Sequence, residues 1–131
     1  MTCSVLGILE VTSILIRKRN DNRLPSALFG QAMIDFRAEV IDSRDFAITS
    51  VHDAGLLSAL ELIITHNLNA TDAIILRSVL DIQAALRVAG HTVLLCAADK
   101  RLIRAAKAEG IPVFDPETDT QQDLARLLAS R

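Results

Sequence analysis

HTVLLCAADKRLIRAAKAEGIPVF, residues 91–114, holds two short apolar runs on either side of a charged stretch with helical spacing. HTVLLCA (91–97) is rich in β-branched and other apolar residues, IPVF (111–114) is similar, and each follows a glycine directly. Fully apolar strands are typical of parallel sheets covered on both faces, and a glycine often ends a helix. The segment therefore predicts a strand, a helix over 100–109 and a second, parallel strand.

The rest of the chain predicts mainly helices. They are expected over residues 5–19, 25–38, 52–65, 71–89 and about 119–129. Two weaker strands are expected at 45–51 and 2–5. The sequence shows no repeat and no linker, and its 131 residues suffice for one compact domain. We therefore expect one α/β domain with a largely parallel sheet over residues 1–131.

The composition limits the classes of function. Half of the residues are hydrophobic, the formal net charge is −2, and the aromatic residues are four Phe with no Trp or Tyr. A chain without a global basic field is a poor general nucleic-acid coat protein, but an enzyme with an acidic metal site remains open. Cys3 and Cys96 form no ligand-like pattern, and no apolar run approaches the roughly 18 residues of a membrane span. We expect a cytoplasmic protein with no membrane partner.

Acidic residues stand directly after the predicted strands and at the start of a predicted helix, where a functional site can form. In parallel α/β sheets a site lies beyond the carboxyl ends of the strands, which selects Asp99 and Asp115. Asp99 is either an N-cap of the next helix or a metal ligand. Thr71 is a good N-cap, and Asp72 follows it at the start of an apolar helix, where an acid also suits the helix dipole.

Glu10 stands inside the apolar helix VLGILEVTSILI. Because a buried bare carboxylate is costly, Glu10 has to be paired, protonated or bound to a cation. Arg17, about two turns further along the same helix, is the obvious partner for a pair. Both alternatives, the ion pair and the cation site, stay open from the residues alone.

Basic residues gather in two clusters. They are Arg17, Lys18, Arg19 and Arg23 in the first, and Lys100, Arg101, Arg104 and Lys107 in the second. Such clusters are usually solvated faces or charges at helix C-termini, and they also suit phosphate contacts. No aromatic residue interleaves with them to stack on bases.

Taken together, the chain resembles the PIN-domain nucleases, the fold of VapC-type toxins. Three blocks in the family's order carry the resemblance: TCSVLGILEVTSILIRKR (2–19), LNATDAIIL (68–76) and TVLLCAADKRLIRAAKAEGIPVF (92–114). Each block holds one acid of the family's pattern, here Glu10, Asp72 and Asp99. The resemblance implies a three-layer α/β/α domain in which these three carboxylates converge at the carboxyl edge of a parallel sheet.

The resemblance also implies a chemistry. Carboxylates packed together favour a hard cation, so Glu10, Asp72 and Asp99 would bind Mg²⁺ or Mn²⁺ for the hydrolysis of RNA phosphodiesters. Arg17, Lys100 and Arg101 would contact the phosphates of the RNA substrate. A ribonuclease of this kind is the toxin of a type II toxin–antitoxin pair, so a cognate antitoxin protein is the expected partner, and a homodimer is allowed.

The family pattern extends beyond what this sequence holds. Its first strand, first helix and first catalytic aspartate would precede Met1, so the PIN-like domain is expected to be N-terminally incomplete. Two other interpretations are consistent with the sequence. One is a catalytically inactive PIN-like module that binds RNA or a protein. The other is an unrelated small α/β regulatory domain, in which Asp72 and Asp99 only cap helices and Glu10 pairs with Arg17.

Overall fold

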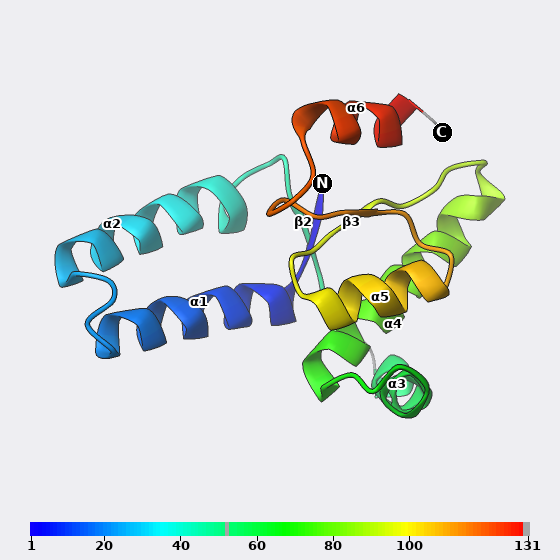
Figure 1. Ribbon diagram of the computed structural model, residues 1–131, viewed down its shortest axis with the longest axis horizontal. Helices are drawn as coiled ribbons and strands as arrows, with labels where there is room; N and C mark the ends of the chain where they lie inside the picture. Colours follow the sequence, from blue (N-terminus) through cyan, green and yellow to red (C-terminus); the bar gives the residue numbers. More distant parts are fainter. Residues whose placement is uncertain (52, 130–131) are drawn as a thin grey trace. The chain divides into compact units, whose positions relative to one another are not determined.

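The computed structural model describes residues 1–51 and 53–129, and it combines helices with short parallel strands, as expected for an α/β protein (Figure 1). The chain divides into two compact units, Met1–Ser50 and Val51–Arg131, which are described in turn. The single domain expected over residues 1–131 stays a prediction. Within the described residues, no helix has both the length and the apolar character that crossing a bilayer requires.

The first unit holds two strands, two α-helices and a short π-helix. In chain order these are β1 (Thr2–Ser4), α1 (Val5–Asn20), α2 (Ser26–Phe36), the π-helix Arg37–Ile41 and β2 (Ala47–Thr49). β1 and β2 pair in parallel, with Cys3 opposite Ile48. α1 begins where the Ser4 hydroxyl accepts a hydrogen bond from the Leu6 N–H at 3.2 Å. This start confirms the predicted strand and helix at the beginning of the sequence.

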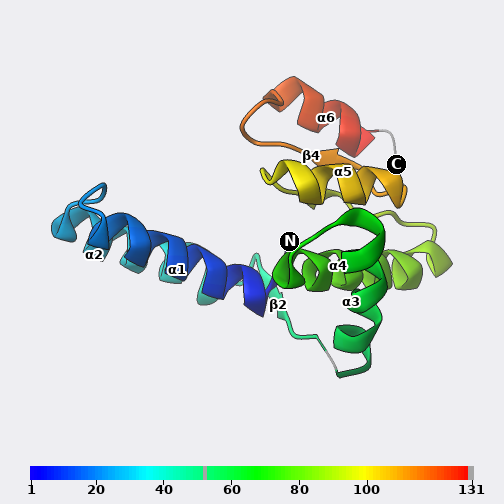
Figure 2. The same cartoon turned by 60° about the horizontal axis from the view of Figure 1, so that its bottom comes forward.

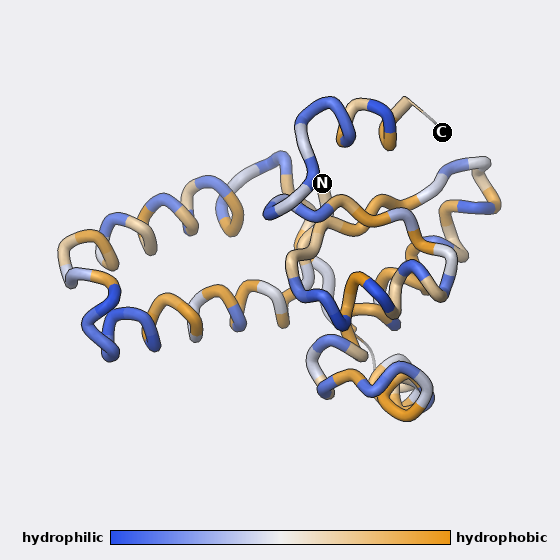
Figure 3. Tube along the Cα trace, in the orientation of Figure 1, coloured by the Kyte–Doolittle hydropathy of each residue, from blue (hydrophilic) through white to orange (hydrophobic). Residues whose placement is uncertain are grey.

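α1 and α2 lie side by side and contact each other along a partly apolar face (Figures 1 and 3). The Arg19 guanidinium lies 4.5 Å from the centroid of the Phe29 ring, a cation–π contact between the two helices. None of the described residues of this unit is buried, and Leu9 and Ile34 are 57% and 63% exposed. The first unit therefore has contacts between its helices but no dry core.

The second unit contains the strand–helix–strand segment. Its elements are α3 (Asp53–His66), α4 (Ala70–Val88), β3 (Leu95–Cys96), α5 (Lys100–Ala108), β4 (Val113–Phe114) and α6 (Gln121–Ala129). β3 and β4 pair in parallel, with Leu95 opposite Val113, as predicted. Within this unit, α6 lies on one side of the strand pair and α4 and α5 lie on the other (Figures 1 and 2).

The buried core of the described residues lies entirely in this second unit. Its members are Ala59, Leu62, Leu68, Ala73, Leu76, Leu95, Leu102, Ile103, Ala105, Ala106, Ile111 and Val113. Leu76 of α4 has no exposed surface, and Ile111, just before β4, is 2% exposed. The core thus joins α4 and α5 to the two strands, and it fixes the ends of these elements relative to one another.

The predicted strand at 91–97 is shorter in the structure, where β3 covers only Leu95–Cys96. A buried side chain of α4 explains the difference. The side-chain oxygen Oε1 of Gln83 accepts hydrogen bonds from the Val93 N–H at 2.8 Å and from the Thr92 hydroxyl at 2.9 Å. Because Gln83 satisfies a backbone donor that a neighbouring strand would otherwise use, this stretch is anchored to the helix instead of to a strand.

Several helix boundaries also differ from the prediction. Asn69, not Thr71, is the N-cap of α4, so the helix begins one residue earlier, at Ala70. Pro25 is the N-cap of α2 and not its first residue, and this helix continues into the π-helix as far as Ile41. The predicted start of α3 at residue 52 falls outside the described residues.

α6 starts at Gln121, two residues later than expected. The reason is a reciprocal cap, in which the Asp123 carboxylate accepts from the Thr120 N–H at 3.0 Å and the Thr120 hydroxyl accepts from the Asp123 N–H at 3.2 Å. The segment 115–119, which contains three acidic residues, therefore remains a loop between β4 and the helix. The predicted strand at 45–51 is present as Ala47–Thr49.

We expect Leu76→Ala to destabilise the second unit by about 2–5 kcal/mol, because it opens a cavity in a fully buried site. Urea unfolding followed by far-UV circular dichroism measures the loss. Val88→Ala on the same helix is the control, since Val88 is 92% exposed and its truncation should change stability by less than about 0.5 kcal/mol. Equal losses for the two variants would contradict the core described above.

Gly110 follows α5 with a φ of +76°, and a Cβ built there meets no atom within 4 Å. We expect Gly110→Ala to cost about 1–2 kcal/mol, from backbone conformation alone. Gly30 inside α2 is the matched control, since its Cβ also meets nothing within 4 Å and its φ is not positive. Gly30→Ala should stabilise the chain by roughly 0.5–1 kcal/mol. Thermal unfolding of the two variants should shift in opposite directions, and a shift in the same direction would refute the argument.

Candidate functional site

Asp72 lies in the first turn of α4, held by the N-cap residue Asn69. The Asn69 side-chain oxygen accepts from the Asp72 N–H at 2.8 Å, and the Asn69 amide donates to Asp72 Oδ2 at 2.7 Å. This reciprocal cap fixes the carboxylate, and the residue Asp72 is only 7% exposed. Asn69 was not identified from the sequence, although the Asn-x-x-Asp spacing ahead of an apolar run was the available signal.

Asp99 is the N-cap of α5, directly beyond the carboxyl end of β3, and this confirms the predicted cap. Its Oδ1 accepts hydrogen bonds from the N–H groups of Arg101 at 2.8 Å and Leu102 at 3.0 Å. The cap uses Oδ1 and not Oδ2, and Asp99 is exposed. An acid that caps a helix can therefore still present its second oxygen to a ligand.

The negative charge of Asp99 acts on the Asp72 carboxylate. Burial, and then the negative charge of Asp99, raise the pKa of Asp72 above its ordinary value, while the hydrogen bond from Asn69 and the charge of Arg101 act in the opposite direction. Two of the three predicted acids, and Arg101 from the predicted phosphate contacts, therefore interact through their charges.

Lys100 is engaged elsewhere, in an ion pair with Asp115. Its Nζ lies 2.5 Å from Asp115 Oδ2, and this hydrogen bond lowers the pKa of Asp115 and raises that of Lys100. Asp115 is 7% exposed, and it also accepts from the Glu117 N–H at 3.0 Å. Asp115 thus organises the loop after β4, and the phosphate contact of Lys100 stays a prediction.

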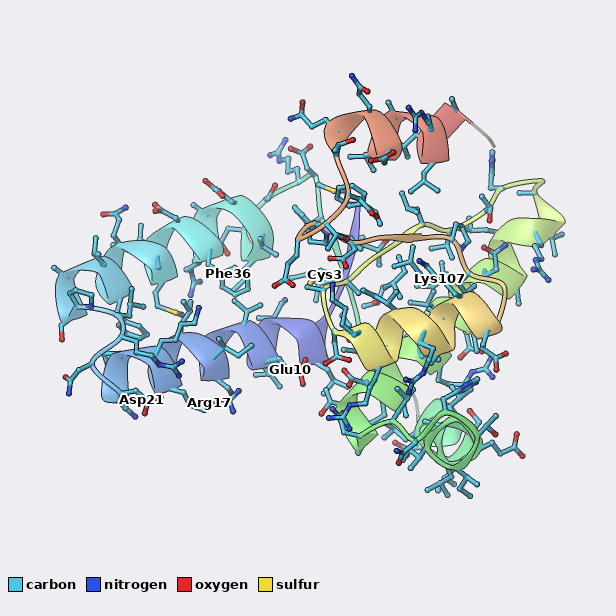
Figure 4. The ribbon with its side chains drawn as sticks, viewed as in Figure 1. Cys3, Glu10, Arg17, Asp21, Phe36 and Lys107 are labelled. Atoms are coloured by element: carbon cyan, nitrogen blue, oxygen red, sulfur yellow. The ribbon has the colours of Figure 1, made fainter. Side chains whose placement is uncertain are left out.

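Glu10 and Arg17 project from α1 in the first unit (Figure 4). Glu10 is half-buried and Arg17 is exposed. Since the first and second units are described separately, the convergence of Glu10 with Asp72 and Asp99 stays a prediction, as does the phosphate contact of Arg17.

The donor atoms of the Asp72–Asp99 pair are suited to a hard cation. Mg²⁺ is usually held by one or two carboxylates, and it retains several waters. A cation between Asp72 and Asp99 would also relieve the repulsion that raises the pKa of Asp72. Within residues 1–51 and 53–129, no group of three or more His, Cys, Asp and Glu side chains is placed to hold a metal ion. The candidate site is therefore a carboxylate pair.

We expect Asp72→Asn to raise the free energy of unfolding near neutral pH. The same substitution should raise it less at low pH. The raised pKa means that ionisation of Asp72 opposes folding at pH values above the folded-state pKa, and that this penalty vanishes below the ordinary Asp range. The difference in unfolding free energy between variant and parent should therefore shrink as the pH falls. Urea unfolding over a pH series measures it.

Asp99→Asn provides the control within the pair, because Asn also caps helices well. In the Asp99→Asn background, the gain from Asp72→Asn should be smaller, since one source of repulsion is gone. Additive effects in this double-mutant cycle would mean that the two carboxylates are not coupled.

Comparisons with protein-family models, with curated proteins and with solved structures find no match to this chain. A function for the chain has to be argued from its own residues. The carboxylate pair, its caps and the cations around it are the features that carry such an argument.

Proposed function

We propose that the chain is a metal-dependent endoribonuclease of the PIN type and the toxin of a type II toxin–antitoxin pair. The observation that carries the proposal is the position of two acids, since Asp72 is buried in the first turn of α4 and Asp99 caps α5 directly beyond β3. The two acids come from blocks far apart in the sequence, they begin the neighbouring helices α4 and α5, and Asp99 follows a parallel strand. This is where a site of a parallel α/β fold is expected.

In this proposal Asp72 and Asp99 hold Mg²⁺ or Mn²⁺ through their carboxylate oxygens. When bound, such a cation supplies Lewis-acid polarisation of the phosphodiester and makes water a better nucleophile. The hydrogen bond from Asn69 holds Asp72 in one orientation, and the α5 cap does the same for Asp99. Two oriented carboxylates need little reorganisation when a cation arrives.

In this proposal Arg101 holds the scissile phosphate. It lies in the first turn of α5, and its charge acts on Asp72. An arginine guanidinium binds phosphate oxygens in a bidentate manner, and it can neutralise charge that develops during hydrolysis. Lys100, which holds the loop after β4 through Asp115, would keep this edge of the site rigid.

Glu10 is the third acid of the proposal, and it would complete the site from α1. The three-layer α/β/α arrangement and the antitoxin partner belong to the same proposal and derive from the resemblance described above. Support for Glu10 is its half-buried position within an otherwise apolar stretch of helix.

The chain should cleave single-stranded RNA in the presence of Mn²⁺, and it should lose this activity with EDTA, Asp72→Asn, Asp99→Asn or Glu10→Gln. Loss of a carboxylate from the site should reduce the rate at least about a hundredfold, the usual effect of removing one electrostatic contributor. Cleavage of a labelled oligonucleotide on denaturing gels measures it. Asp81→Asn is the matched control, since Asp81 lies on α4 but pairs with Arg77.

A second measurement separates the metal site from turnover. Mn²⁺ should raise the unfolding temperature of the parent and of Asp81→Asn, but not of Asp72→Asn, because a ligand that binds only the folded state stabilises it. Metal-dependent cleavage that survives Asp72→Asn and Asp99→Asn would refute the site. A folded chain that binds RNA and never cleaves it would refute the nuclease and favour a binding module.

A further inference from the structure

α5 separates its residues into two faces with opposite character. Leu102, Ile103, Ala105 and Ala106 are buried. At 3.6 residues per turn, the four cations of this helix fall within an arc of about 120° on the other face. They are Lys100, Arg101, Arg104 and Lys107, and all of them are exposed. The same arc contains no acidic residue, and hydrophilic and hydrophobic positions alternate along α5 in Figure 3.

On the other helices of the second unit, two of the three arginines have carboxylate partners, and among the described residues the Arg87 side chain has none. Arg77 pairs with Asp81 on α4, and Arg126 pairs with Asp123 on α6. Among the described residues, Lys100 is the one cation of α5 with ion-pair partners, which are Asp115 and, at 3.9 Å, Glu117. Within the described part of the chain, the side chains of Arg104 and Lys107 make no hydrogen bond or ion pair; Lys107 is labelled on α5 in Figure 4.

The cations of α5 begin at the carboxylate pair. Asp99 caps the first turn, Arg101 stands two residues later, and Arg104 and Lys107 follow at intervals of three residues. A nine-residue helix extends for about 13 Å, so these side chains form a row that leads away from Asp72 and Asp99. We call Arg101, Arg104 and Lys107 the basic strip.

We propose that the basic strip is a track for the phosphodiester backbone of single-stranded RNA, which it guides to the Asp72–Asp99 pair. The inference rests on the proposed function and adds Arg104 and Lys107 as positioning residues. Cations that contact phosphates fix the register of a strand without reading its bases. No aromatic residue lies in α5 to stack on bases, so binding should be tolerant of sequence.

The test is RNA binding by the full chain, measured by fluorescence anisotropy with labelled oligo(U) and oligo(A) in EDTA, where cleavage cannot interfere. The variant is Arg104→Gln with Lys107→Gln. The matched control is Arg87→Gln with Arg126→Gln. It also removes two positive charges, one from α4 and one from α6. Far-UV circular dichroism establishes that both variants are folded.

The strip variant should bind both oligonucleotides several-fold more weakly, and the control should bind like the parent. The slope of the logarithm of the binding constant against the logarithm of salt concentration should fall by about 0.7 for each phosphate that the variant no longer neutralises. In the cleavage assay, the strip variant should raise KM and leave kcat nearly unchanged, because Arg104 and Lys107 would bind the strand away from the reacting phosphate.

The possible failures can be told apart. If the strip variant and the control weaken binding equally, or neither does, the basic strip is not a track, whether or not the chain cleaves RNA. Absence of RNA binding by the parent also overturns the track. If binding depends on the strip but no metal-dependent cleavage occurs, the track stands and the nuclease proposal fails.

Discussion

Burial of the first turns of α4 takes a carboxylate out of water, and the candidate site follows from this constraint. Ala73 and Leu76 have no exposed surface, and their neighbour Asp72 is buried with them. The carboxylate is held there by Asn69 and by the field of Arg101, against the desolvation and the charge of Asp99 that raise its pKa. The packing that stabilises the second unit therefore also buries a negative charge, which a nearby positive charge would stabilise.

Much of the fold could be predicted from sequence, because the relevant signals are local. The apolar runs before Asp99 and Asp115, and the glycines at 90 and 110, placed β3, α5 and β4 in the correct order. The extent of β3 could not be predicted, since it depends on Gln83 of α4, whose side chain takes the Val93 N–H. A contact between a helix side chain and a distant backbone leaves no periodic trace in a sequence.

The site was predictable in part for the same reason. Strand ends and helix starts identify Asp99 and Asp72 as acids in informative positions, and burial and the charge of Asp99 raise the pKa of Asp72. Spacing did not indicate that Lys100 would be held by Asp115, because either of two neighbouring cations could have filled that role. Asn69 was missed because Thr71 is also a good N-cap, and only the packing of α4 decides between them.

Under the proposed function, the N-cap of α5 couples folding and chemistry in a single residue, and this has an evolutionary consequence. Asp99 supplies a cap through Oδ1, a function that Asn or Ser also performs, and it supplies a negative charge that neither residue can replace. A lineage that loses the catalytic role is still under selection to keep the helix start. Its descendants should therefore drift to Asn or Ser at position 99, and rarely to Ala. Asn or Ser at this position would indicate a protein that has lost the proposed site and kept the fold.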